Sequence, residues 1–247
     1  MNDQVRAELL KQRTTSTTLA LLGGMVGLVV LAIGLHLLTP SASELMSRGD
    51  QLLAFEVGTR VGMLFAALVG ALAITAEFRY GTIHPTFLVA PRRTPVVAAK
   101  LVVSGLFGFV FGVLAEALMS GATTAALGAR GITVELTEGD VVRLLVGGSA
   151  AAALWAVIGL GVGALVRNQI PTLVGLCAWL LLVEHLFPAE AARYLPGWAG
   201  LALAVDASTT RLADSVPGVP TALVVLAAVA LVAGIAGWRS MVQRDAA

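Results

Sequence analysis

Four ionisable residues stand inside otherwise apolar stretches of this sequence, and side-chain chemistry is expected there first. They are Arg60, Glu116 and the pair Glu184-His185. A charged side chain costs roughly 2.5–3.5 kcal/mol at the centre of a membrane helix, so it usually lines a path, joins an ion pair or lies near an interface. We interpret Arg60, Glu116 and Glu184 as candidate substrate-path residues.

Each of these residues has a second interpretation that the sequence leaves open. Glu116 lines a substrate path, pairs with Arg60, or lies near the outer end of a long helix. Arg60 can extend its stem so that the guanidinium reaches the interface. Glu184-His185 is either an interfacial cap or part of a proton relay.

Hydrolytic and metal chemistry are not supported by the spacing of the candidate residues. Ser149 and His185 are the only conceivable nucleophile and base at matching depth, and nothing in the sequence brings them together. His36, His84 and His185 fall on different segments, which is not the spacing of a metal site. We therefore expect neither an enzyme nor a bound metal.

A nucleotide site is also not expected on this chain. A phosphate-binding loop needs a glycine-rich turn followed by Lys and then Ser or Thr. The chain has two lysines, Lys11 and Lys100, and Gln12 and Leu101 follow them. We expect no cofactor on this chain and no nucleic-acid partner.

The composition predicts an all-α membrane protein. Of 247 residues, 57% are apolar and 13% are charged, whereas a soluble domain has roughly a quarter charged residues. Whole windows are apolar on every face, unlike the alternating strands of a membrane barrel. Six spans are expected in a single transmembrane domain over 1–247, after an interfacial helix over 1–16; their bounds are 17–38, 57–76, 95–127, 141–166, 171–187 and 219–238.

Several connections and spans carry finer predictions. Ser41–Glu56 is expected to be a polar loop. The third span would be about 50 Å long at 1.5 Å per residue, so it should tilt, break near Ser120-Gly121 or project beyond the bilayer. The fourth span is rich in Gly and Ala, which predicts a helix contact face. Ala189–Asp206 is expected to form short interfacial or re-entrant helices, broken at Pro196-Gly197.

The distribution of basic residues predicts the orientation. With both termini in the cytoplasm, the cytoplasmic segments contain Arg6, Lys11, Arg13, Arg79, Arg92, Arg93, Lys100, Arg167, Arg239 and Arg244. The opposite segments contain Arg48, Arg130, Arg143, Arg193 and Arg211, and Arg60 stays in the membrane. Cytoplasmic loops carry the excess of Lys and Arg, so the N-in, C-in arrangement is favoured.

The segment Glu77–Lys100 concentrates charge, proline and a Gly-Thr break between two apolar spans. Gly81 can end the second span in the left-handed conformation, and Thr82 can cap a short helix that Pro91 stops. Such a helix, clamped between two spans, would transmit force. The alternative is a plain interfacial loop in which the basic residues only fix the topology.

This segment resembles the permease subunits of ABC-2 type transporters. The matching residues are Glu77-Phe78-Arg79-Tyr80-Gly81-Thr82, then Thr86-Phe87-Leu88, Pro91-Arg92-Arg93 and Ala99-Lys100-Leu101. The chain is most similar to the small six-span permeases common in actinobacteria. The leader Arg6–Lys11 and the broken Leu195-Pro196 region also look like that family, so the likeness extends over nearly the whole chain.

The resemblance implies a multi-pass protein of a bacterial plasma membrane, surrounded by lipids, that pairs with a second copy or a paralogue. A separate cytoplasmic ABC ATPase would bind ATP and Mg²⁺ and drive the spans through the coupling helix. The implied ATPase-coupling residues are Glu77, Phe78, Arg79, Tyr80, Gly81, Thr82, Arg92 and Arg93. The leader would be the connecting helix, and Ala189–Asp206 the outer re-entrant helices.

The function expected from this likeness is ATP-driven export of a hydrophobic or amphipathic compound, such as a drug, antibiotic, peptide or lipid, including multidrug efflux. Two alternatives stay open. The chain is a membrane anchor or regulator of an ATPase that transports nothing, or an ion-coupled secondary transporter.

Overall fold

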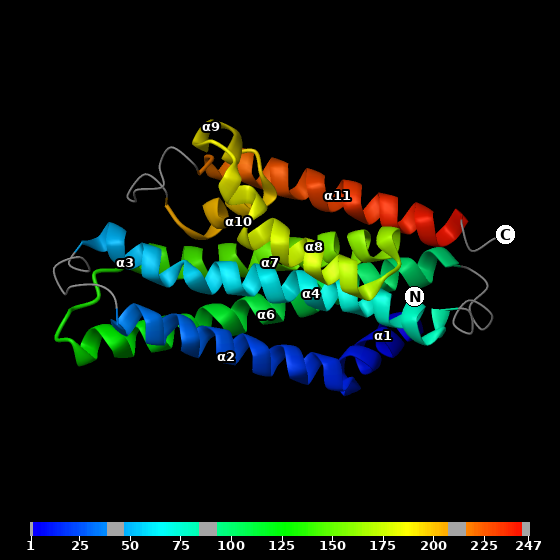
Figure 1. The fold of residues 1–247 in the computed structure, drawn as a ribbon, viewed down its shortest axis with the longest axis horizontal. Helices are drawn as coiled ribbons and strands as arrows, with labels where there is room; N and C mark the ends of the chain where they lie inside the picture. The colour runs from blue at the N-terminus through cyan, green and yellow to red at the C-terminus, as the bar shows by residue number, and fades with distance from the viewer. Residues whose placement is uncertain (1, 39–46, 84–92, 207–215, 244–247) are drawn as a thin grey trace.

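The computed structural model describes residues 2–38, 47–83, 93–206 and 216–243, and they form an elongated helical bundle (Figure 1). The elements are α1 (Asn2–Thr14), α2 (Ser16–Leu38), α3 (Arg48–Phe55), α4 (Val57–Tyr80), α6 (Arg93–Ala129), α7 (Glu138–Val166), α8 (Gln169–Leu181), a 3₁₀ turn (Val183–Leu186), α9 (Ala189–Ala192), α10 (Pro196–Ala204) and α11 (Val219–Gln243).

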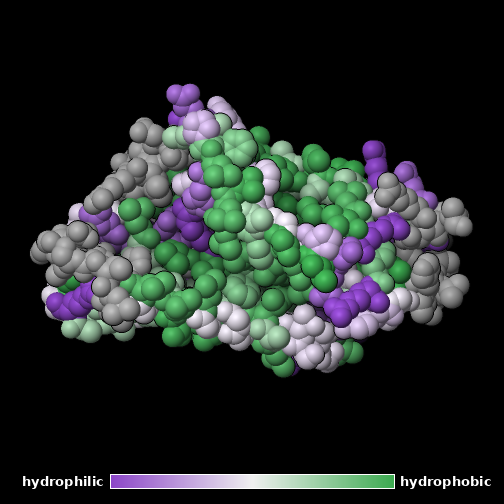
Figure 2. Space-filling view, viewed as in Figure 1, coloured by the Kyte–Doolittle hydropathy of each residue, from purple (hydrophilic) through white to green (hydrophobic). Residues whose placement is uncertain are grey.

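Six helical segments in the described ranges are long and apolar enough to cross a membrane. Apolar side chains cover most of the visible middle of the bundle, and hydrophilic ones gather mainly toward its ends (Figure 2). Large aliphatic residues such as Leu19, Val30, Val224 and Val232 are more than 60% exposed. Apolar exposure on this scale suits a lipid solvent. The described residues thus confirm the predicted helical fold with six helices long and apolar enough to span a membrane.

The bundle has two ends, which we call the α1 end and the α3 end. The α1 end holds α1, the C-termini of α4 and α11 and the start of α6 (Figure 1). The α3 end holds α3 and the connection between α6 and α7. Both described chain ends therefore lie at the α1 end.

The expected polar loop Ser41–Glu56 is wrong for its second half, because α3 forms there. Ser47 caps the helix by accepting a hydrogen bond of 3.1 Å from the backbone N–H of Asp50. The amide of Gln51 is buried and bonds the backbone of the α6–α7 connection. Tertiary contacts thus order a segment whose local sequence appeared too polar to pack.

The structure also decides two points about helix continuity. Of the three outcomes left open for the third span, the break near Ser120-Gly121 does not occur, because α6 runs unbroken over its 37 residues. At 1.5 Å per residue it measures about 55 Å, so it tilts or projects beyond a bilayer core of about 30 Å. The fifth span, expected over 171–187, corresponds to one apolar segment, Gln169–Leu186, which is α-helical to Leu181 and ends in the 3₁₀ turn.

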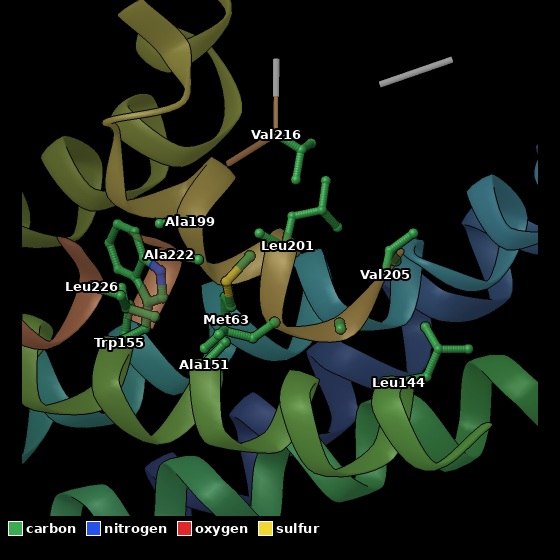
Figure 3. Close-up of a cluster of buried hydrophobic side chains, with 14 of the residues drawn as sticks. Met63, Leu144, Ala151, Trp155, Ala199, Leu201, Val205, Val216, Ala222 and Leu226 are labelled. Carbon is green, nitrogen blue, oxygen red and sulfur yellow. The ribbon is translucent and has the colours of Figure 1, made fainter. Parts of the chain in front are cut away.

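The region after the fifth span contains two short helices, α9 and α10, as the sequence predicted for Ala189–Asp206. Pro196 is the first residue of α10, where its missing N–H leaves no hydrogen bond unmade. The break therefore lies just before Pro196, within the turn that follows α9. Helix α10 packs on α7 and α11, and Figure 3 shows Leu201 of α10 above Ala151 of α7.

The Gly/Ala-rich helix α7 is the centre of the bundle, and the predicted contact face is confirmed. A Cβ on Gly159 would lie 2.0 Å from the carbonyl oxygen of Ala67 on α4, and one on Gly161 would lie 2.3 Å from that of Ala233 on α11. On α4, a Cβ at Gly70 would lie 1.9 Å from the carbonyl oxygen of Ala156. These helices touch backbone to backbone, which only small residues allow.

Gly70→Ala should destabilise the bundle by about 1–3 kcal/mol or more, because the new methyl group meets a backbone oxygen that cannot rotate away. Thermal unfolding in mild detergent measures the effect. Gly121→Ala on α6 is the matched control, since no atom lies within 4 Å of its Cβ position. A Gly70→Ala protein as stable as the control would contradict the close α4–α7 packing.

Candidate functional site

The α1 end contains a buried cluster of two lysines and two glutamates, which we call the lysine–glutamate cluster. Lys100 Nζ lies 2.7 Å from Glu77 Oε1 and 2.8 Å from Glu8 Oε2. Lys11 Nζ lies 3.0 Å from Glu77 Oε1 and 3.3 Å from Glu8 Oε1. The Lys100 side chain is 3% exposed and that of Lys11 is 46% exposed.

The cluster joins three helices that are distant in sequence. Glu77 lies in the last turn of α4, Lys100 lies near the start of α6, and Glu8 and Lys11 are neighbours on α1. Both lysines of the chain belong to this cluster, and their two positive charges balance the two carboxylates of Glu8 and Glu77. That balance makes burial tolerable, because each charge keeps opposite partners in place of water.

The electrostatics at Lys11 favour the charged form. Burial lowers its pKa, but the Coulomb attraction and hydrogen bonds of Glu77 and Glu8 outweigh burial. The net result is a pKa raised above the ordinary value of 10.5. The contribution of Lys11 to stability is therefore fully present below pH 10.5. It is lost as the pH rises through the raised pKa of the folded protein.

Helix α4 ends as the sequence predicted. Gly81 has a φ of 68° in the left-handed region, and its N–H lies 3.4 Å from the carbonyl oxygen of Phe78. The N–H of Thr82 donates to the carbonyl oxygen of Glu77 at 3.0 Å. This Schellman-like turn fixes the backbone of Glu77 beside the cluster. The short helix predicted to follow falls largely on residues 84–92, which lie outside the described residues.

The remaining predicted coupling residues of α4 face the surface or the neighbouring helices. Arg79 bonds Gln169 Oε1 at 3.1 Å and lies 5.7 Å from the ring centre of Tyr80. Tyr80 is 72% exposed. The ring of Phe78 lies under the guanidinium of Arg167, 5.1 Å away. Arg79, Tyr80 and the adjacent Gly-Thr turn are thus available at the surface, whereas Glu77 is not.

The two predicted coupling arginines before the third span have different outcomes. Arg92 lies outside the described residues. Arg93 is the first residue of α6, and its Nη1 donates to the backbone oxygen of Val242 at 3.3 Å. This contact fastens the start of α6 to the last turn of α11.

The three predicted substrate-path residues lie away from the cluster, toward the α3 end. Glu116 is 1% exposed, and its Oε1 accepts a hydrogen bond of 2.5 Å from the hydroxyl of Thr59. Gly58 and Gly148 enclose it so tightly that a Cβ on either would lie within 3 Å of the carboxylate. The carboxylate therefore occupies a gap made by small residues between α4 and α7.

The expected pair between Glu116 and Arg60 does not form. Arg60 Nε instead donates to Glu56 Oε1 at 3.2 Å, one helical turn earlier, and its guanidinium lies 5.0 Å from the Trp198 ring centre. Glu116 lies 116 − 100 = 16 residues along α6 from Lys100, or about 24 Å. The hydrocarbon core of a bilayer is about 30 Å thick, so a distance of about 24 Å from the α1 end favours the interpretation that Glu116 lies near the interface on the α3 side.

Arg60 and Glu184 line one cavity of about 250 Å³ together with His185. That volume is below the range of about 300–1,000 Å³ of typical small-molecule sites. Glu184 Oε1 accepts hydrogen bonds from the indole N–H of Trp179 at 2.6 Å and the backbone N–H of Gly197 at 2.9 Å. These bonds fasten α10 to the end of α8, so Glu184 serves as a cap there.

Sequence reasoning missed the role of Lys100, Lys11 and Glu8, which it treated as topology anchors or as parts of the leader. One signal was available for Lys100, because it is the only lysine inside a predicted span, and a buried cation needs a partner. Nothing in the linear sequence identifies Glu8 and Glu77 as those partners. Their meeting depends on how α1 folds back on α4 and α6.

No protein-family model and no curated protein matches this chain. The family resemblance therefore depends on the residues quoted for it above, and the geometry must carry the functional argument.

Lys100→Gln should destabilise the bundle by about 3–5 kcal/mol, because it leaves two buried carboxylates with only the partly exposed Lys11. Lys11→Gln should cost about 1 kcal/mol or less, since that side chain is nearly half exposed. Thermal unfolding in mild detergent compares them. Arg6→Gln, at an exposed position of α1, controls for loss of a positive charge; a Lys100→Gln protein equal to it would contradict the cluster's role.

Proposed function

We propose that this chain is the membrane-spanning permease subunit of an ABC-2 type exporter, driven by a separate cytoplasmic ATPase and paired with a second permease. The observation that carries the proposal is the lysine–glutamate cluster. It fastens α1 to the end of α4 and the start of α6, the two helices that flank the segment 84–92.

The mechanical argument follows from this connection. A force on segment 84–92 acts on α4 through Gly81 and on α6 through Arg93. Because the cluster links both helices to α1, their ends move together rather than apart. Breaking a buried ion pair by losing one partner costs about 3–5 kcal/mol, so a rigid-body movement is favoured over local distortion. Such a joint suits a coupling helix that transmits the closure of an ATPase.

The charge of the two ends supports an orientation with the α1 end in the cytoplasm. The described basic residues at that end are Arg6, Lys11, Arg13, Arg79, Arg93, Lys100, Arg167 and Arg239. Five described basic residues lie away from that end: Arg48, Arg60, Arg130, Arg143 and Arg193. The positive-inside rule then gives N-in and C-in, with α9 and α10 as short re-entrant helices on the outer side.

The coupling residues divide into two roles under this proposal. Arg79 and Tyr80 are exposed and would touch an acidic or aromatic-binding surface of the ATPase. Glu77 is buried in the cluster and acts as a positioning residue, because it holds the end of α4 that carries Arg79 and Tyr80. The bound substrate would be hydrophobic or amphipathic, because Arg60, Glu116 and Glu184 are each already engaged by neighbouring groups.

Arg79→Glu should uncouple ATP hydrolysis from transport, because it reverses a charge on the exposed coupling surface without touching the buried cluster. The measurement is ATP-dependent movement of an amphipathic dye in vesicles that contain the chain and the ATPase that copurifies with it. Arg13→Glu makes the same charge change at an exposed position of α1 and should transport normally.

Three results would argue for other functions. Stimulated ATP hydrolysis without dye movement would favour the anchor or regulator. Dye movement that follows an ion gradient without ATP would favour a secondary transporter. If no ATPase copurifies from the native membrane under conditions that preserve other transporter complexes, the proposal is wrong.

A further inference from the structure

A second feature of the bundle is an apolar groove between α6, α7 and α11, which faces the surrounding lipid. Its volume is about 430 Å³, and its lining is almost entirely hydrocarbon. The groove is lined by Thr94, Ala98 and Leu101 of α6, Leu154 and Val157 of α7, and Ala227, Ala230, Leu231, Gly234, Ile235 and Trp238 of α11.

The length of the groove matches the depth of one leaflet. Val219 to Trp238 covers about 30 Å of α11 at 1.5 Å per residue, which is the thickness of a hydrocarbon core. Ala227 to Trp238 covers about 16 Å, or half of it. The groove therefore runs from the middle of the bilayer to the α1 side, where Trp238 lies at the level expected for an interfacial aromatic residue.

Two arginines are direct chain neighbours of residues that line the α1-side end of the groove. Arg93 directly precedes the groove residue Thr94, and its guanidinium lies against the last turn of α11 through the carbonyl of Val242. Arg239 is exposed and lies four residues after Ile235, so it continues the row of α11 residues that borders the groove. An apolar slot with cations at the interfacial end complements an acyl chain below an anionic headgroup.

The geometry points to a binding site for an anionic phospholipid of the leaflet on the α1 side. One acyl chain lies along α11 in the groove, and the phosphate group lies between Arg93 and Arg239. The space for the chain is the groove volume of about 430 Å³. Its floor at Gly234 has no side chain, and a Cβ there would lie in ordinary contact with Val157 and Leu101, at 3.5 Å and 3.7 Å. This inference does not depend on the proposed transport function.

The test is a titration of the purified chain in detergent with phosphatidylglycerol and, separately, phosphatidylcholine of identical acyl chains, read by native mass spectrometry. We expect phosphatidylglycerol to bind more tightly, with each arginine contributing a factor of about five. Arg239→Gln and Arg93→Gln should each remove about that factor for phosphatidylglycerol and leave phosphatidylcholine unchanged. Arg6→Gln on α1 should change neither lipid.

A steric pair of variants tests the groove itself. Ala227→Phe fills the groove and should weaken both lipids, whereas Ala228→Phe, at an exposed neighbouring position that does not line the groove, should not. Both side chains face lipid, so both proteins should fold, which thermal unfolding verifies. Equal binding of the two lipids, or equal binding by the two variants, would overturn the site. A dimer that Ala227→Phe alone disrupts, with lipid binding unchanged, would also overturn it, because a second copy would then fill the groove.

Discussion

The pairing of Lys100 with Glu8 and Glu77 is the contact on which the α1 end of the bundle depends. Lys100 is almost fully buried, and a buried ammonium group is tolerated only beside opposite charge. Its two carboxylate partners come from different helices, so this pairing holds both α1 and α4 to the start of α6. The second lysine, Lys11, completes the charge balance at the edge of the cluster.

The rest of the bundle is held by close backbone contact. Helix α7 meets α4 and α11 at glycines where a Cβ would lie within about 2 Å of a carbonyl oxygen. In lipid, helix association gains little from burying apolar surface, and tight contact between small residues replaces that driving force. The result is a core in which larger side chains such as Trp155 occupy the spaces that the small residues leave between α7, α10 and α11.

The ionisable groups toward the α3 end are engaged in a different way. Glu116, Arg60 and Glu184 each have a hydrogen-bond or ion-pair partner, and none forms the pair expected between Glu116 and Arg60. Their partners are Thr59, Glu56, Trp179 and the backbone of Gly197, which position helix ends. Charge in this membrane protein therefore fixes structure at both ends, and the middle stays apolar.

The sequence by itself determined the fold class and most of the spans, because runs of apolar residues and capping residues act locally. Gly81 as a helix end and the small-residue face of α7 were predictable for that reason. The helix α3, the unbroken α6 and the partners of Lys100 were not, because each depends on contacts between segments distant in the chain. Tertiary structure alone decided that Glu77 turns inward to two lysines while Arg79 and Tyr80 stay at the surface, since a one-dimensional pattern cannot say which charges meet.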